Sequence, residues 1–160
     1  PATPLGILRE YKQEKKIRYI GITTTSENEY PSLLRVMNTE RIDFIGIDYA
    51  VDNLEVEQTI LPAAKERGIA VLCYAPFGRT RLWRRVGERP VPDYAKEFGA
   101  STWAQFFLKF VIGHPVITAA TPATSQPANM ADNIGGMMGA VPDEAMRRRM
   151  VATVEALPQA

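Results

Sequence analysis

The chain has 160 residues, a length typical of one domain that can bury a substantial core. Hydrophobic residues make up 46% and charged residues 23%, and the formal net charge is +1, so the composition gives no bulk attraction to nucleic acid or to an anionic membrane. A single cysteine, Cys73, excludes an internal disulfide framework, and one cysteine with one histidine argues against a His/Cys metal site.

No apolar run approaches the roughly 20 residues of a membrane span, and the low cysteine content fits a reducing compartment. We therefore expect a cytoplasmic protein. The chain begins at Pro1 without methionine, so we expect a processed chain or a piece of a longer one.

Strands and helices alternate along the predicted chain. Runs of β-branched and aromatic residues predict strands at 17–23, 42–49, 69–75 and 116–120. Apolar residues at helical spacing predict helices at 5–16, 30–38, 54–67, 101–113, 127–138 and 142–157. Pro62 should kink or restart the third helix, Gly68 should end it and Ser101 should cap the fourth. Residues 76–92 are predicted to form a long loop, followed by a helical turn at 93–98.

This regular alternation predicts an α/β fold with a parallel sheet and right-handed helical crossovers. Four βα units are half of an eight-fold barrel, which typically needs about 250 residues. Two architectures remain: an open doubly wound sheet, or a half barrel that something else completes. No G-x-G-x-x-G or P-loop follows any strand, which removes support for the first. The second leaves strand edges exposed. We expect one domain over 1–160, with closing helices at 127–160.

Parallel α/β folds bind ligands at the carboxyl ends of their strands. The first strand ends at Thr23 and Thr24, whose hydroxyls could bond a carboxamide or phosphate, or simply serve the turn. Asp48 ends the second strand as either a functional carboxylate or a hydrogen-bonded strand-end residue. Tyr74 ends the third and offers a flat face for a ring, or a core edge. By alternation, Cys73 points the other way and is predicted to be a core residue.

The stretch 116–133 resembles an anion site. A short strand leads through a small-residue turn to Pro127, which suits the first helical position, and Ser125 or Gln126 would lie at the cap. Backbone N–H groups and the helix dipole then converge on one spot, although an ordinary βα connection has the same form. Five arginines fall within 79–89, where they suit phosphate oxygens or form a solvated loop; they are Arg79, Arg81, Arg84, Arg85 and Arg89. Because barrels often bind phosphate at the loops after their last two strands, the phosphate interpretation is favoured.

Catalytic groups are not evident at these strand ends. No nucleophile–base pair, paired carboxylates or lysine can be assigned there. His114 precedes a strand, at the opposite end of the sheet from the expected site. The sequence therefore predicts a binding surface without an assigned acid or base.

Several motifs, in order, resemble the aldo/keto reductase family across nearly the whole chain. They are KIRYIGI at 16–22, ILPAA at 60–64, RGIAV at 67–71, APFG at 75–78, PATS at 122–125 with DN at 132–133, and VPDE at 141–144 with RM at 149–150. The resemblance implies a (β/α)8 TIM barrel that reduces carbonyls with NADPH, and this chain is similar to its C-terminal half, strands five to eight. The family's catalytic tyrosine, aspartate, lysine and histidine lie in the other half, so the resemblance implies no catalytic residue in this chain.

The resemblance also implies how this half would hold NADP(H). Thr23 and Thr24 would lie beside the nicotinamide carboxamide, and Tyr74 would stack on the nicotinamide. The pyrophosphate loop would use Ala75, Phe77 and Arg79 or Arg81. The adenosine 2′-phosphate and adenine would contact Ala123, Thr124, Ser125, Asn129 and Asn133.

Three positions depart from the family pattern. A strand-six glutamine is replaced by Gly46, and two cations of the last loop are replaced by Ala123 and Asn129. Losing both cations weakens recognition of a 2′-phosphate, since each could donate a charge-assisted bond. The remaining grip would depend on backbone N–H groups, hydroxyls and arginines of the neighbouring loop.

Three hypotheses follow. The chain could be the NADP(H)-binding half of an oxidoreductase, inactive alone and reducing a small carbonyl only if the other half is supplied. It could instead be a non-catalytic half barrel that binds or scaffolds and forms homo-oligomers through its open edges. A phosphate-sugar enzyme is ranked last because no acid or base can be named.

Overall fold

The structure is a computed structural model that describes residues 3–159. It contains one parallel sheet of order β1-β2-β3-β4, built from β1 (Gly21–Thr24), β2 (Phe44–Asp48), β3 (Ala70–Tyr74) and β4 (Ile117–Ala120). The order follows the chain without reversal, whereas a doubly wound sheet reverses its order at a switch point. The predicted parallel βα units are confirmed, and the order is that of consecutive barrel strands.

Seven α-helices and four short 3-10 helices connect these strands within residues 3–159. The α-helices are α1 (Pro4–Gln13), α2 (Tyr30–Thr39), α3 (Ile60–Arg67), α4 (Arg81–Val86), α5 (Trp103–Ile112), α6 (Pro127–Gly136) and α7 (Glu144–Glu155). The 3-10 helices are η1 (Glu27–Glu29), η2 (Glu55–Glu57), η3 (Gly78–Thr80) and η4 (Asp93–Phe98). Gly68 and Gly99 end α3 and η4 in left-handed conformation, with φ of 65° and 73°, as predicted.

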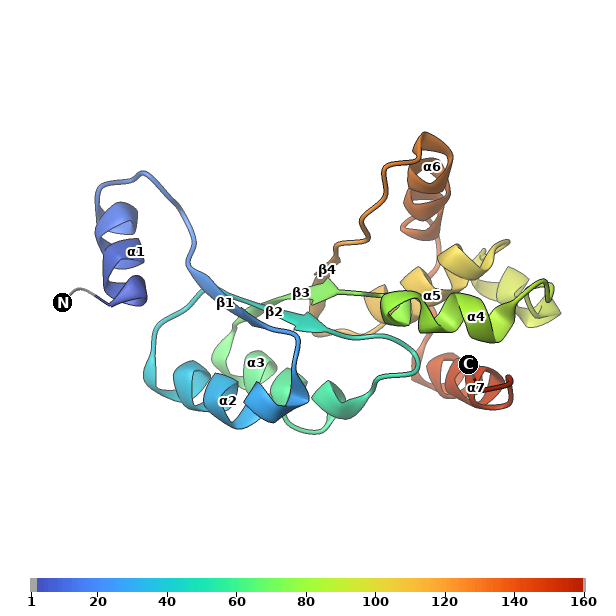
Figure 1. Ribbon diagram of the computed structural model, residues 1–160, viewed down its shortest axis with the longest axis horizontal. Coiled ribbons are helices and arrows are strands. Elements are labelled where there is room, and N and C mark those ends of the chain that lie inside the picture. The colour runs from blue at the N-terminus through green and yellow to red at the C-terminus, as the bar shows by residue number, and fades with distance from the viewer. Residues whose placement is uncertain (1–2, 160) are drawn as a thin grey trace.

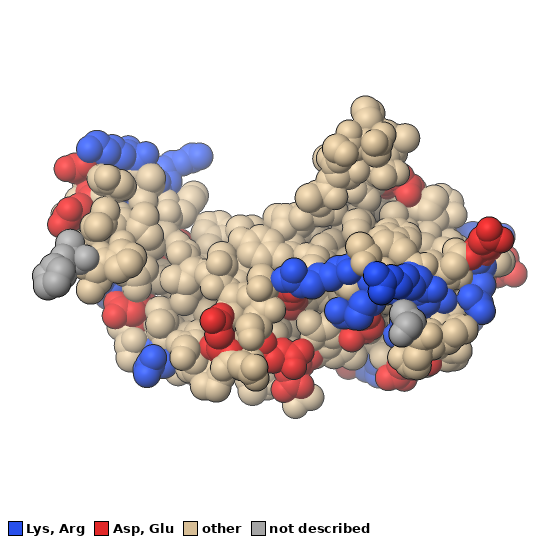
Figure 2. Space-filling model, viewed as in Figure 1, with Lys and Arg blue, Asp and Glu red and all other residues tan. Residues whose placement is uncertain are grey.

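One face of the sheet is covered and the other is open. α2 and α3 lie beneath the sheet, while α1 and α6 rise beyond its two ends on the opposite side (Figure 1). The molecular surface is hollowed between α1 and α6, and little charge shows there (Figure 2). We call this side of the sheet the open face; it carries Thr23, Phe44, Gly46, Leu72 and Tyr74.

The core lies on the covered side. Ile45 and Ile47 of β2 and Val71 and Cys73 of β3 are fully buried there, because alternate residues of a strand face the same side. The predicted inward orientation of Cys73 is confirmed. Burying each large aliphatic side chain contributes roughly 1.5–3 kcal/mol. The α5 helix adds an aromatic set to this core, namely Trp103, Phe106, Phe107 and Phe110.

Several predicted boundaries were wrong. The strand predicted at 17–23 begins only at Gly21, because Gly21 pairs with Phe44, the first residue of β2, and earlier residues have no partner strand. The helix predicted at 54–67 is divided into η2 and α3, which places Pro62 in the first turn of α3, where its missing N–H is tolerated. Thr102, and not Ser101, caps α5: its Oγ1 accepts from the Gln105 N–H at 3.2 Å.

The segment 76–92 was predicted to be a loop but contains η3 and α4. The α4 helix is anchored by Leu82 and Val86, which are buried in the core. Arg85, also buried, donates to the Val154 carbonyl oxygen at 2.6 Å and so joins α4 to the end of α7.

The two ends of the sheet carry most of the exposed large apolar side chains. Within the described residues, β1 and β4 each have one strand neighbour, so both outer edges are unpaired. The β1-end patch consists of Ile7, Tyr11 and Tyr19. The β4-end patch consists of Met130, Ile134, Met137, Met138 and Val141. The exposed edges expected of a half barrel are thus present, with apolar side chains beside each.

Candidate functional site

A cavity of about 500 Å³ lies where the loops after β3 and β4 meet α5 and α6. Five of the residues predicted to bind the cofactor line it: Phe77, Ala123, Thr124, Asn129 and Asn133. Five further lining residues were not predicted: Trp83, Thr102, Trp103, Ala104 and Asp132. The cavity therefore lies beyond the carboxyl ends of β3 and β4, the region that the sequence indicated.

Aromatic rings form one wall of the cavity. The Phe77 and Trp83 rings lie 5.1 Å apart between centroids, and Trp103 stacks on Phe107 at 5.5 Å with an interplanar angle of 28°. The Trp103 Nε1–H donates to the Arg89 carbonyl oxygen at 2.8 Å, which fixes that ring. Flat faces of this kind can pack against a heterocyclic base.

Polar groups of α5 and α6 form the opposite wall. The Asp132 carboxylate accepts from Thr102 Oγ1 at 2.8 Å and from Gln105 Nε2 at 2.7 Å, so its position is fixed. The two helices approach closely at Gly136, where a Cβ would lie 3.0 Å from the Gln105 Cα.

Asn133 differs from its neighbours in this wall. Its side chain is only 3% exposed, and its amide has no hydrogen-bond partner among residues 3–159. Buried polar groups are nearly always hydrogen-bonded, because an unpaired one costs free energy. The Asn133 amide, with two donor hydrogens and an acceptor oxygen, is therefore free for a ligand in the cavity.

The loop between β4 and α6 keeps its backbone donors available. The α6 helix begins at Pro127, as predicted, with Gln126 at the cap position and no side-chain capping bond. The N–H groups of Ala128 and Asn129 have no partner in the described part of the chain. The Gln126 N–H donates to Thr124 Oγ1 at 3.1 Å, while the predicted Ser125 is exposed and outside the cavity lining.

The loop after β3 is strained and anchored. Ala75, Gly78, Arg79 and Thr80 have positive φ, from 47° to 76°. For the three non-glycine residues this conformation costs of order 1–3 kcal/mol each. A Cβ at Gly78 would lie 2.8 Å from the Asp52 Oδ1, so the loop passes very close to that carboxylate.

Two ion pairs hold this loop. The Arg79 Nε donates to Asp48 Oδ2 at 2.6 Å, and the Arg81 Nε donates to Asp52 Oδ2 at 3.1 Å. Both arginine side chains remain about half exposed, at 55% and 49%. Neither lines the cavity. Lys and Arg side chains form a band over α4 and the loop before it (Figure 2).

The open face brings three further positions together. Thr23 pairs with Gly46 across β1 and β2, and a Cβ at Gly46 would lie 2.5 Å from the Tyr74 ring, so that ring lies over the glycine. Thr24 instead faces the covered side, where its hydroxyl bonds the Glu29 carboxylate. The structure thus groups Thr23 with Tyr74 and separates Thr24 from them.

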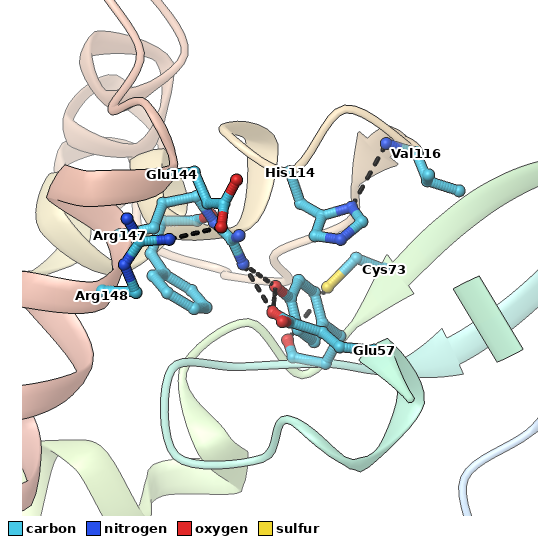
Figure 3. Close-up of polar contacts among 9 residues, drawn as sticks. Glu57, Cys73, His114, Val116, Glu144, Arg147 and Arg148 are labelled. Carbon is cyan, nitrogen blue, oxygen red and sulfur yellow. Dashed lines mark hydrogen bonds and ion pairs between the residues drawn. The ribbon is translucent and has the colours of Figure 1, made fainter. Parts of the chain in front are cut away.

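A buried polar cluster joins α7 to the β2 end of the sheet (Figure 3). The Arg147 guanidinium donates to Glu57 at 2.6 Å and to the Tyr49 hydroxyl, and also to the Phe110 carbonyl oxygen at 3.2 Å. Burial raises the pKa of the Tyr49 hydroxyl well above its usual range and lowers the pKa of the nearby His114 imidazole.

Cys73 belongs to the same cluster. Its thiol donates to the Tyr49 carbonyl oxygen at 3.1 Å, and burial raises its pKa to about 12. Because the thiol, the phenol and the imidazole are held in their neutral forms near pH 7, the cluster serves packing and offers no activated nucleophile.

Comparisons with known proteins identify the fold. No protein-family model matches the chain. An NADP(+)-named aldo-keto reductase of Schizosaccharomyces pombe is 27% identical over 99 residues, which is 58% of this chain and 28% of that protein. A Klebsiella pneumoniae aldo-keto reductase in complex with NADPH superposes with a TM-score of 0.69 at 20% identity, over 99% of this chain and 55% of that one. The chain has the βα fold of aldo-keto reductases.

Other aldo-keto reductase structures agree. A Klebsiella pneumoniae structure with NADP and acetate gives a TM-score of 0.70 at 18% identity, over 95% of this chain and 53% of that one. The apo form of a Bacillus halodurans aldo-keto reductase gives 0.69 at 20% identity, over 95% and 57%. The chain thus spans about half the length of the aldo-keto reductase structures it matches. The resemblance drawn from the sequence motifs is confirmed.

Two searches bear on other site classes. Between residues 3 and 159, no helix has the length and apolarity needed to span a membrane. The same residues contain no group of three or more His, Cys, Asp or Glu placed to hold a metal ion.

Proposed function

We propose that the chain is the C-terminal, NADP(H)-binding half of an aldo/keto reductase-like oxidoreductase that reduces carbonyls by hydride transfer. The observation that carries this proposal is the unpartnered amide of Asn133, buried in a cavity at the carboxyl ends of β3 and β4. The relatives named for NADP(+) or bound to NADPH support the choice of cofactor. The carbonyl and the proton donor would require residues outside this chain.

Adenine is the group we place in the cavity. An asparagine amide can pair with the adjacent donor and acceptor of an adenine edge, which is how asparagine reads adenine elsewhere. The Trp83 and Phe77 rings would pack against the base, and Thr124 and Asn129 would contact the attached ribose.

The rest of the cofactor would then run toward the open face. The pyrophosphate would follow the loop of Ala75 and Phe77, where the exposed guanidinium groups of Arg79 and Arg81 can bond its oxygens. The nicotinamide would reach the Tyr74 ring, and its carboxamide would lie near Thr23. Thr24 and Ser125 would act only through neighbouring residues, because one faces the covered side and the other lies outside the cavity.

Isothermal titration of the folded chain with NADPH tests the proposal. We expect saturable one-to-one binding accompanied by a change in NADPH fluorescence. Circular dichroism of the same sample establishes that it is folded. A folded sample that gives neither heat nor a fluorescence change would contradict the proposal for this chain.

Self-association is a second candidate, and the unpaired edges of β1 and β4 favour it. Two copies would supply eight strands, the number in a closed (β/α)8 barrel, and would cover the patches at both ends. Sedimentation velocity at micromolar concentration tests this, and Ile134→Lys should weaken association while Ser32→Lys on exposed α2 should not. A strict monomer would contradict it. A cytoplasmic location remains part of both proposals.

A further inference from the structure

We infer that the cavity does not recognise a 2′-phosphate on the adenosine, so that the chain binds NAD(H) about as tightly as NADP(H). This inference rests on the proposed function, because it concerns the adenosine end of the same dinucleotide. It adds a specificity that the names of the relatives do not carry, since those mention only the phosphorylated cofactor.

The charge of the cavity wall is the first support. None of its ten lining residues is Lys, Arg or His, and the one charged residue is the acidic Asp132. The partners of Asp132 are a hydroxyl and a neutral amide, so no cation neutralises its charge. A phosphate monoester carries about two negative charges near pH 7 and would be repelled by this carboxylate.

The cations of the neighbouring elements are held elsewhere. Arg79 and Arg81 are fixed by Asp48 and Asp52 outside the lining. The buried Lys109 Nζ donates to the carbonyl oxygens of Met138 and Ala140, at 2.6 and 2.8 Å.

The remaining arginines of the α4 region are also directed away. Arg85 donates to carbonyl oxygens at the end of α7, and Arg89 donates to the carbonyl oxygens of Arg85 and Val86. Arg84 is exposed on α4 and is not part of the lining.

Asp132 is suited to an unmodified ribose. A carboxylate has about four acceptor sites, and two of them are used by Thr102 and Gln105, so it can still accept from ribose hydroxyls. Dinucleotide sites commonly use an acidic residue on the 2′-hydroxyl of NAD, and an arginine to accommodate the 2′-phosphate of NADP.

Some groups near the cavity favour a phosphate. The free N–H groups of Ala128 and Asn129, the Thr124 hydroxyl and the α6 dipole could each attract an anion. These neutral donors oppose the repulsion from Asp132. We therefore expect near-equal affinities and no exclusion of NADPH.

Calorimetric titration with two ligand pairs tests the inference. NADH and NADPH differ only at the 2′ position, as do 5′-AMP and 2′,5′-ADP, and the second pair isolates the adenosine end. We expect the Kd values within each pair to agree within about threefold. Binding of NADPH about tenfold or more tightly than NADH would overturn the inference. If none of the four ligands binds, the proposed function itself fails, and the inference fails with it.

Substitution at Asn129 provides the second arm, because this residue is exposed in the first turn of α6 and lines the cavity. Asn129→Arg adds the missing cation, and it should tighten NADPH and 2′,5′-ADP by about tenfold while NADH and 5′-AMP change by less than about threefold. Asn129→Gln is the matched neutral control and should leave both ratios unchanged. An Asn129→Arg variant that does not discriminate the two ligands of either pair would contradict the placement of the 2′ position.

Discussion

Asn133→Leu separates a residue kept for ligand binding from one kept for the fold. The asparagine is 3% exposed on α6, and its amide has no hydrogen-bond partner within residues 3–159. Leucine has a similar volume and no polar atoms. The substitution therefore removes the amide while preserving most of the packing against α5.

The expected magnitudes follow from this arrangement. An unpaired buried polar group costs about 1–3 kcal/mol, and water in the cavity would reduce that cost. The free energy of unfolding without ligand should consequently stay unchanged or rise by up to about 1 kcal/mol. Loss of the bonds to adenine should weaken dinucleotide binding by about 1–3 kcal/mol, which is roughly 5- to 150-fold in Kd.

Urea denaturation and calorimetric titration with NADPH measure the two effects on one preparation. Asn38→Leu is the matched control, because Asn38 is exposed on α2, away from the cavity. That control should leave binding unchanged. A loss of more than about 1 kcal/mol in unfolding free energy, with NADPH affinity retained, would refute the reasoning, since the amide would then be structural.

Three further predictions concern stability. Lys109→Met removes two charge-assisted bonds to buried carbonyls and should lower the unfolding free energy in urea by about 3 kcal/mol. Burial lowers the pKa of His114, so only the unfolded chain gains its proton near pH 6.5; stability should be complete above about pH 6.5 and decline as the pH falls through the folded pKa, and His114→Gln should flatten that decline in urea midpoints. Gly78→Ala, at φ of 58° and against Asp52, should lower the melting temperature and weaken NADPH binding.

Local chemistry explains which elements could be predicted. Gly68, Gly99 and Pro127 mark helix ends through their own backbone preferences, and the structure has each in its predicted role. The six residues of α4 carry no comparable signal. A helix this short is unstable alone and forms here because Leu82 and Val86 are buried in the core.

The same distinction applies to the cavity. Phe77, Ala123 and Asn133 lie directly after strands or in a helix that follows one, so their position could be predicted from strand order. Thr102 and Trp103 belong to the start of α5, which reaches the cavity only because α5 packs closely beside α6. Helical periodicity marks Trp103 as a core residue and gives no sign that it also lines a cavity. The close contact that Gly136 permits is the physical link, and it joins segments far apart in sequence.

The arginines after β3 show how two sequence interpretations can both be incomplete. Charge alone offered either phosphate contacts or a solvated loop. In the structure, Arg79 and Arg81 pair through Nε with Asp48 and Asp52, which lie 31 and 29 residues earlier in the chain. The second oxygen of each aspartate is buried without a partner, so releasing either arginine would leave an unpaired buried carboxylate.

The ion pairs therefore hold the strained loop of residues 75–80 in place and fix the direction of each guanidinium group. Because a guanidinium has five N–H donors, an arginine held through Nε still has four for a phosphate. Both side chains are about half exposed, which leaves those donors accessible from solvent. A pyrophosphate on this loop would then meet arginines whose orientation is already set, so less side-chain entropy would be lost on binding than with mobile arginines.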